Sequence, residues 1–170
     1  VPATLAELGK VNFKGTFDGF INDFTTYGAF TTALGTVYTD LSIQLPEETK
    51  NTTYTGRIRT EQFDAGKLLG QNDFNQLNLD LEVNGKGLKV EDIDAEISGN
   101  ISTLRYNNYL YQSISLNGTF NEQVFNGLLT SKDPNADLDF NGSISFKNKM
   151  PQMDFISTIN RLNLQALHFT

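Results

Sequence analysis

The segment Asp94–Phe120 reads DAEISGNISTLRYNNYLYQSISLNGTF and contains two runs in which apolar and polar residues alternate. Ile97 and Ile101 occupy alternate positions of the first run, and Leu116 and Phe120 do so in the second. A side-chain period of two is typical of a β-strand with one buried face. A pair of asparagines separates the runs, and asparagine suits the tight turn of a hairpin. The segment therefore predicts an antiparallel hairpin with one apolar face.

The same alternation recurs over most of the chain. Further alternating runs cover residues 13–17, 37–45, 77–83 and 138–146. Polar segments rich in Asn, Asp, Pro and Gly lie between the runs, as expected for turns. An antiparallel sheet with one apolar face and one solvated face explains this pattern. We predict an all-β fold built on an elongated, strongly curled, antiparallel-rich sheet, with a closed β-sandwich or barrel as the alternative.

Two segments depart from the alternation and predict short helices. Residues 1–9 are rich in Ala, Leu and Glu and predict a short helical lead-in. Residues 61–71, EQFDAGKLLGQ, place Leu68 and Leu69 as a short helical turn would. We expect this second helix to cap one end of the sheet. Residues 1–170 are interpreted as a single β-rich section of a longer repetitive protein.

Several strand-like runs carry a glycine on their apolar side. The glycines of this kind that recur at a regular spacing are Gly15, Gly56, Gly99 and Gly142. Their separations are 41, 43 and 43 residues, which predicts a repeat of a few strands per unit. Glycine inside a strand costs ~0.5–1 kcal/mol relative to alanine, so its recurrence indicates a bulge, a sharp bend or the close approach of another body. Such bends favour a curled sheet, and bends in an ordinary closed sandwich or barrel are the alternative.

The composition limits the class of protein. The chain has 13 Lys and Arg against 20 Asp and Glu, a net charge of −7, which argues against binding nucleic acid through its phosphates. It has no cysteine, so disulfides, thiolate zinc sites and a cysteine nucleophile are excluded. No apolar run approaches the ~20 residues of a membrane-spanning helix. The chain begins Val1-Pro2 without a methionine, and we expect it to be a processed or excised piece.

The titratable residues predict no enzyme, no metal site and no cofactor, because no convergent set of them stands out. His168 is the only histidine. The run Asp133–Asp139 has the alternating oxygens of a calcium loop but lacks that loop's glycine and final glutamate. Tyr106, Tyr109 and Tyr111 keep a carbohydrate-binding β-sandwich open as an alternative function, although packing across the hairpin explains them as well.

The apolar side of a curled sheet would form a trough, and a lipid suits it as the occupant. The residues predicted to line this trough are Phe13, Phe17, Ile58, Leu79, Leu81, Val83, Ile97, Ile101, Leu116, Phe120, Phe140 and Ile144. Fully burying one CH₂ group contributes ~0.8 kcal/mol, and roughly fifteen would contribute on the order of 10 kcal/mol before ordering and translational costs. Since apolar burial has no preferred direction, the pattern predicts a non-selective grip on acyl chains.

Three stretches resemble the repeats of bacterial TamB-like proteins, which belong to the AsmA-like superfamily and are also called translocation and assembly module inner-membrane subunits. They are RIRTEQFDAGKLLG at 57–70, LNLDLEVNGKGLKVEDIDAEISGNISTLRYNNYLYQSISLNGTF at 77–120 and FNGLLTSKDPNADLDFNGSISF at 125–146. The resemblance is closest to the Bacteroidetes members and extends over residues 11–169. It rests on weak repeat motifs and not on an invariant signature.

The resemblance implies a fold, a location and partners. The β-rich part of the family is similar to an elongated, folded-over sheet, a "β-taco" groove with an apolar interior. The parent protein would be anchored in the inner membrane and cross the periplasm. Its expected roles are phospholipid transport between membranes and outer-membrane assembly, with a barrel partner of the TamA or Omp85 type. The alternative is a structural or interaction module whose edge strands pair with a client, a partner β-protein or another copy.

Overall fold

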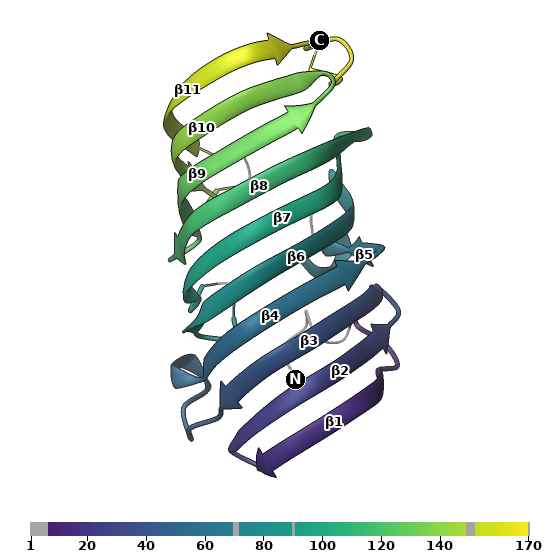
Figure 1. The fold of residues 1–170 in the computed structure, drawn as a ribbon, viewed down its shortest axis with the longest axis vertical. Helices are drawn as coiled ribbons and strands as arrows, with labels where there is room; N and C mark the ends of the chain where they lie inside the picture. The colour runs from purple at the N-terminus through teal and green to yellow at the C-terminus, as the bar shows by residue number, and fades with distance from the viewer. Residues whose placement is uncertain (1–6, 70–71, 90, 149–151, 170) are drawn as a thin grey trace.

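The structure is a computed structural model that describes residues 7–69, 72–89, 91–148 and 152–169. Strands dominate it (Figure 1). In chain order they are β1 (Asn12–Phe20), β2 (Asp23–Thr32), β3 (Gly35–Gln44), β4 (Thr53–Glu61), β5 (Phe63–Asp64), β6 (Phe74–Lys86), β7 (Asp94–Tyr106), β8 (Tyr109–Asn121), β9 (Val124–Asp133), β10 (Ala136–Ser145) and β11 (Gln152–Leu162). The helical elements are the 3₁₀-helix η1 (Thr49–Asn51) and the α-helix α2 (Ala65–Leu69). The predicted all-β class is confirmed.

All the strands in the described parts of the chain belong to one 11-stranded sheet. Its order is β1-β2-β3-β4-β6-β7-β8-β9-β10-β11, with β5 beside β6. Every neighbouring pair is antiparallel. Figure 1 shows the strands stacked like rungs from β1 to β11, which form the two edges. The sheet is not closed, so the alternative of a closed β-sandwich or barrel is wrong.

Two-residue turns connect the central hairpins. Asn107 and Asn108 join β7 to β8 with φ of 49° and 62°, and Glu122 and Gln123 join β8 to β9 with φ of 47° and 63°. Left-handed conformations at both turn positions match the twist of the flanking strands. Asparagine tolerates this conformation well, and the hairpin predicted around the two asparagines is confirmed. Glutamate and glutamine carry no comparable preference, so the sequence did not identify the second turn.

The strand registers show which side chains share a face of the sheet, because they pair apolar residues with apolar residues on neighbouring strands. Val83 of β6 pairs with Ile97 of β7, and Leu116 of β8 pairs with Leu129 of β9. Residues paired directly across antiparallel strands lie on the same face. Followed from β1 to β11, these pairs define one face that is mainly apolar, called here the apolar face, and an opposite polar face.

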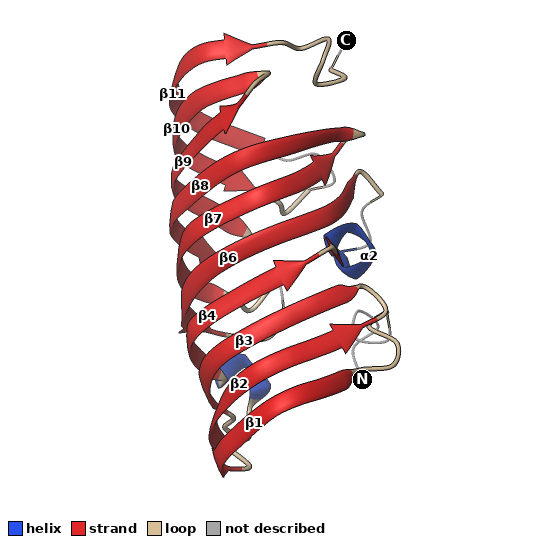
Figure 2. Cartoon of the chain, turned by 45° about the vertical axis from the view of Figure 1, so that its right-hand side comes forward, coloured by secondary structure: helices blue, strands red, loops and turns tan. Residues whose placement is uncertain are grey.

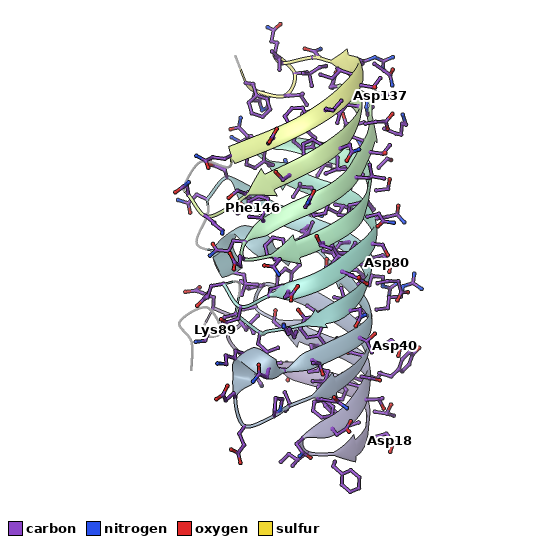
Figure 3. All side chains as sticks on the ribbon, turned by 90° about the vertical axis from the view of Figure 1, so that its left-hand side faces the viewer. Asp18, Asp40, Asp80, Lys89, Asp137 and Phe146 are labelled. Carbon is purple, nitrogen blue, oxygen red and sulfur yellow. The ribbon has the colours of Figure 1, made fainter. Side chains whose placement is uncertain are left out.

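The strand glycines Gly56 and Gly99 lie on the apolar face. Figure 3 shows the strands of the sheet as curved ribbons. Gly56 in β4 and Gly99 in β7 have φ of +136° and +143°, conformations that other residues rarely adopt. A Cβ atom at Gly56 would overlap the carbonyl oxygen of Asp40, and one at Gly99 would overlap that of Asp80. Glycine is required here because the neighbouring strand's backbone occupies the space of a side chain.

The regular glycine spacing in the sequence does not correspond to a regular spacing in the sheet. Gly15, Gly56, Gly99 and Gly142 stand on β1, β4, β7 and β10. In the strand order these are positions one, four, six and nine. The middle interval is shorter because β5 and α2, between β4 and β6, take up chain length without extending the main path.

The helix expected within residues 61–71 covers Ala65–Leu69, and residues 63–64 form β5. Figure 2 shows α2 at the ends of the strands. Its Ala65 joins Leu34 and Phe63 in a small buried cluster with half-buried apolar neighbours. Of the expected lead-in helix over residues 1–9, the structure describes only 7–9, where residues 7 and 8 form a turn.

The sheet leaves much of its surface open. A compact monomer of this mass exposes about 8,300 Å², whereas this 18.9 kDa chain exposes 10718 Å². Among the described residues, helical structure is confined to η1 and α2, so no second layer of secondary structure covers the apolar face. A sheet normally buries its apolar face against another layer. The apolar face of this sheet lacks such a layer in the described residues and is therefore the candidate binding surface.

Candidate functional site: the apolar face of the sheet

The registers place all twelve residues predicted as trough lining on the apolar face. They are Phe13, Phe17, Ile58, Leu79, Leu81, Val83, Ile97, Ile101, Leu116, Phe120, Phe140 and Ile144. Val83 and Phe140 are buried and Phe17 is 55% exposed. The other nine are half-buried. The set spans the sheet from β1 to β10 as one surface and does not converge on a single pocket.

Sequence reasoning missed the contribution of β2 to this face. Phe24 and Phe30 of β2 lie opposite β1 and β3 residues of the apolar face. Between them, Thr26 is 2% exposed and its hydroxyl lies 3.5 Å from that of Thr39 on β3. Because β2 carries threonine on both faces, its residues do not alternate clearly between apolar and polar. The cross-strand register was therefore needed to assign them.

Aromatic clusters mark both ends of the apolar face. Near the β1 edge, the ring of Phe13 lies 4.7 Å from that of Phe17 and 4.6 Å from that of Phe30. Near the β11 edge, Phe140 and Phe155 stack with their ring centroids 4.8 Å apart. Such pairs contribute about 0.5–1.5 kcal/mol beyond the area they bury. They extend the face to each edge of the sheet.

A hydrogen-bond network around the buried Asp133 lies on the apolar face at the turn between β9 and β10. The carboxylate of Asp133, 1% exposed, accepts a 2.6 Å hydrogen bond from the hydroxyl of Tyr109. It also accepts hydrogen bonds from the backbone N–H groups of Gln112, at 3.0 Å, and Asn135, at 2.8 Å. Burial and the Asp133 hydrogen bond raise the pKa of Tyr109. The carboxylate thereby ties β8 to the β9–β10 turn.

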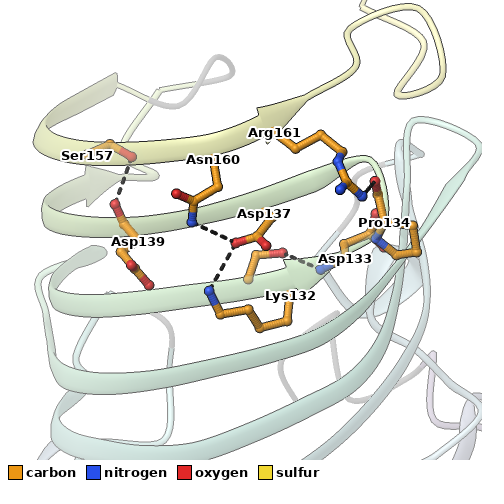
Figure 4. Close-up of polar contacts among 9 residues, drawn as sticks. Lys132, Asp133, Pro134, Asp137, Asp139, Ser157, Asn160 and Arg161 are labelled. Carbon is orange, nitrogen blue, oxygen red and sulfur yellow. Dashed lines mark hydrogen bonds and ion pairs between the residues drawn. The ribbon is translucent and has the colours of Figure 1, made fainter.

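The run of aspartates considered for calcium does not converge in space. Asp133 belongs to the apolar face, whereas Asp137 pairs with Lys132 on the polar face. The Oδ1 atom of Asp137 lies 3.0 Å from Nζ of Lys132 and accepts a hydrogen bond from Asn160 (Figure 4). Hydrogen bonds from Asn160 and Lys132 lower the pKa of Asp137. No cluster of three or more potential metal ligands occurs in the described parts of the chain.

The polar face carries charged pairs exposed to solvent. Figure 3 shows labelled aspartates projecting from this side along the length of the sheet. Arg57 donates two hydrogen bonds of 2.6 Å to the carboxylate of Asp80, and this contact raises the pKa of Arg57 and lowers that of Asp80. The guanidinium of Arg59 lies 4.2 Å from the ring centroid of Tyr38. Solvent screens exposed pairs of this kind, so they add little to stability.

The three hairpin tyrosines pack within the protein. The ring of Tyr106 lies 4.7 Å from that of Phe74, and the ring of Tyr109 lies 4.8 Å from that of Tyr111. The hydroxyl of Tyr109 is engaged by Asp133. The Tyr106–Phe74 contact joins β7 to β6, whereas Tyr109 and Tyr111 are neighbours along β8. These contacts leave the carbohydrate alternative without a specific supporting observation.

Tyr111 is expected to ionise at a higher pH than an exposed tyrosine. Burial, followed by the nearby Tyr106 and Tyr109, raises its pKa from 10.0 to about 12. Because the folded-state pKa is the higher one, its contribution to stability is complete below about pH 10 and is lost as the pH rises towards 12. The difference in tyrosinate absorbance between the wild type and Tyr111→Phe should show this titration. A transition near pH 10 in the folded protein would contradict the placement of the side chain.

Comparison of the chain with protein-family models, with curated proteins and with solved structures found no match. Within the described residues, none of the helices has the length and apolar character needed to cross a membrane. The candidate site therefore rests on the geometry of the sheet alone.

Proposed function

We propose that the apolar face shields phospholipid acyl chains and that the chain is a non-enzymatic section of a TamB-like protein for inter-membrane lipid transport. The observation that carries the proposal is an apolar face that extends across the sheet without a covering layer among the described residues. Exposed apolar surface beyond a few hundred Å² commonly marks an interaction site. An acyl chain is a suitable occupant because it is long, flexible and wholly apolar.

In this proposal the sheet curls around its apolar face and forms a β-taco-like groove. The curled shape is supported by the positive φ of glycines on that face, such as Gly56 and Gly99. Their lack of a side chain lets the strands bend sharply where the concave side would be most crowded. The large exposed area of the chain is consistent with a groove that side chains do not fill.

The chemistry of the face matches a passive grip on lipid. Its residues are mainly Phe, Leu, Ile and Val, and the charged Asp133 on it is buried in its own hydrogen-bond network, so an occupant gains about 0.8 kcal/mol per buried CH₂. No charged side chain is needed to orient the ligand, since apolar burial is non-directional. Lipid tails could therefore move along the face from one strand to the next.

The likeness of residues 57–70, 77–120 and 125–146 to TamB-like repeats supports the wider setting of the proposal. The parent protein is then anchored in the inner membrane, extends through the periplasm and takes part in outer-membrane assembly. Its barrel partner is of the TamA or Omp85 type. In this setting the present chain supplies one stretch of a longer lipid path.

A photo-crosslinking residue placed at Ile97 or Leu116 is expected to label phospholipid when the chain is incubated with phosphatidylethanolamine vesicles. Both side chains are half-buried on the apolar face, so a probe there should lie within reach of a bound acyl chain. Mass spectrometry of the labelled protein identifies the adduct.

Asn100 and Thr119 provide matched controls on the same two strands, because both are exposed on the polar face. Probes at these positions are expected to give far less lipid adduct, because they point away from the face that would hold the acyl chain. Equal labelling from the two faces, or no adduct from either, would refute the proposal. Native mass spectra that retain fatty-acyl adducts after mild purification would give independent support.

A further inference from the structure

Residues 163–169, called here the rim strap, follow β11 and turn back towards β10 (Figure 1). The backbone N–H of Asn163 donates a 2.9 Å hydrogen bond to the carbonyl oxygen of Asn135 in the β9–β10 turn. At the other end of the strap, Nδ2 of Asn107 in the β7–β8 turn donates a 2.9 Å hydrogen bond to the carbonyl oxygen of His168. Nδ1 of His168 lies 3.1 Å from the carbonyl oxygen of Asn107. The rim strap therefore bridges two turns and spans the ends of β8 and β9.

The apolar face is deeply buried where the rim strap spans it. Asp133 is 1% exposed, and Ser131 and Ala136 are each 4% exposed. Leu167 of the strap is also 1% exposed, whereas most residues predicted as trough lining are only half-buried. Since the strap is bonded to the turns on both sides, it covers this end of the apolar face and inserts its leucine there.

The rim strap begins in the same way as the segment that contains α2. Oδ1 of Asp64 accepts a 3.0 Å hydrogen bond from the backbone N–H of Lys67. Oδ1 of Asn163 likewise accepts a 3.1 Å hydrogen bond from the N–H of Ala166, also three residues later. The N–H of Asp64 donates to the carbonyl oxygen of Leu34 in the β2–β3 turn, as that of Asn163 does in the β9–β10 turn. The two segments are therefore rim caps of one local design.

The two caps differ in how firmly they are anchored. At α2, Leu34, Phe63 and Ala65 form a buried cluster with half-buried apolar neighbours. In the rim strap, Leu167 is the one buried side chain, and the contacts with Asn107 are exposed. Segments with few buried apolar contacts and exposed hydrogen bonds open at a lower free energy than the core. The rim strap therefore opens more readily than α2.

We propose that the rim strap is a gate for acyl chains. In the closed state described here Leu167 is inserted at the end of the apolar face, and release of the strap from Asn107 opens that end to an acyl chain. This inference rests on the proposed function and names a place where its ligand enters the face. An acyl chain suits the opened face because it replaces the apolar contacts of the leucine side chain. Bound lipid then shifts the strap towards its open state.

Amide hydrogen exchange measures the opening of the strap without lipid. The backbone N–H groups of Ala166 and Lys67 make equivalent bonds in the two caps, so they form a matched pair. We expect that of Ala166, corrected for intrinsic rate, to exchange at least about tenfold faster than that of Lys67 and than the paired amides of β8. An Ala166 rate no faster than these would mean that the strap opens only with the rest of the sheet, and would overturn the proposal.

Truncation of the inserted side chain should favour the open strap. Leu167→Ala is expected to raise the exchange rate of the strap amides at least about thirtyfold, because opening no longer exposes a buried leucine. Leu164→Ala makes the same change in the same segment, at a side chain that is 45% exposed, and should stay within about threefold of the wild type. Unchanged rates in β8 show that the sheet of each variant remains folded.

A milder variant acts on the other partner of the strap. Asn107→Gly keeps a residue that accepts the φ of 49° and removes the side-chain donor to His168. It is expected to speed exchange of the strap amides about three- to tenfold. Asn108→Gly makes the same change at the other position of the turn, where the side chain is exposed, and should leave the rate unchanged. Equal rates in the two variants would contradict the proposed latch.

A photo-crosslinking residue at Ile114 tests whether the gate admits lipid. Ile114 is 7% exposed on the apolar face and pairs with Ser131, close to the end that the strap covers. With phosphatidylethanolamine vesicles, Asn107→Gly should raise the lipid adduct at Ile114 about three- to tenfold, in step with strap opening. The adduct from a probe at Ile97, nearer the opposite ends of the strands, should not change.

The two probes separate failure of the gate from failure of the proposed function. Adduct at Ile97 without an increase at Ile114 in Asn107→Gly would refute the gate and leave the proposed function standing. An equal increase at Ile114 in Asn108→Gly would also refute the gate, because that variant keeps the bond to the strap. No adduct at either position in any variant would refute both.

Discussion

Replacement of Gly99 by alanine is expected to lower the free energy of unfolding by about 3 kcal/mol or more. Gly99 has a φ of +143°, and an added Cβ would overlap the carbonyl oxygen of Asp80 and lie 3.0 Å from Cα of Leu81. Alanine must therefore either adopt a strained conformation or push β6 away from β7. Both strands lie in the middle of the sheet, so the rest of the sheet resists the displacement. Urea denaturation followed by circular dichroism measures the loss.

Asn100→Ala is the matched control for this prediction. Asn100 adjoins Gly99 but is exposed on the polar face, so its truncation should change the free energy of unfolding by no more than about 0.5 kcal/mol. If Gly99→Ala proves as stable as this control, the backbone of β6 does not exclude a side chain at position 99. The explanation of the recurring glycines by crowding would then fail.

Replacement of Asp133 by alanine is expected to cost about 3 kcal/mol of stability. The carboxylate is 1% exposed and accepts hydrogen bonds from the Tyr109 hydroxyl and from the backbone N–H groups of Gln112 and Asn135. Its removal leaves three part-buried donors without this acceptor. Asp133→Asn should also destabilise the protein, because its NH₂ group would replace one acceptor oxygen with a donor.

The exposed Asp139 serves as the control for Asp133. Its side chain lies on the polar face of β10, and Asp139→Ala should stay within about 0.5 kcal/mol of the wild type. The two truncations are compared by thermal and urea unfolding under the same conditions. Equal and small effects would show that the network around Asp133 does not hold the β9–β10 turn to β8.

Local patterns in the sequence were sufficient to predict much of the sheet. Alternation in residues 94–120 predicted the hairpin of β7 and β8, and the same period assigned the twelve lining residues to one face, as the registers now do. The segment EQFDAGKLLGQ, residues 61–71, predicted a helix, of which five residues, Ala65–Leu69, are helical. These predictions succeeded because side-chain period and turn chemistry are properties of neighbouring residues.

The role of Asp133 was not predictable from its neighbours. It precedes Pro134 and Asn135 in a segment that is typical of an exposed turn, and its alternation with later aspartates resembled a metal-binding loop. Its burial arises because β9 ends on the apolar face beside Tyr109, which lies 24 residues earlier. A contact between residues 24 positions apart in the sequence cannot be inferred from the local alternation of side chains.

The sequence by itself determined that the strands are antiparallel, that they have one apolar and one polar face, and that glycine recurs on the apolar one. Only the tertiary structure decided that the strands form a single open sheet and where glycines such as Gly56 and Gly99 meet the neighbouring strand. The physical reason is that alternation of side chains is the same in a closed sandwich, a barrel and an open layer. What covers the apolar face, and which edges remain unpaired, depends on contacts between strands distant along the chain.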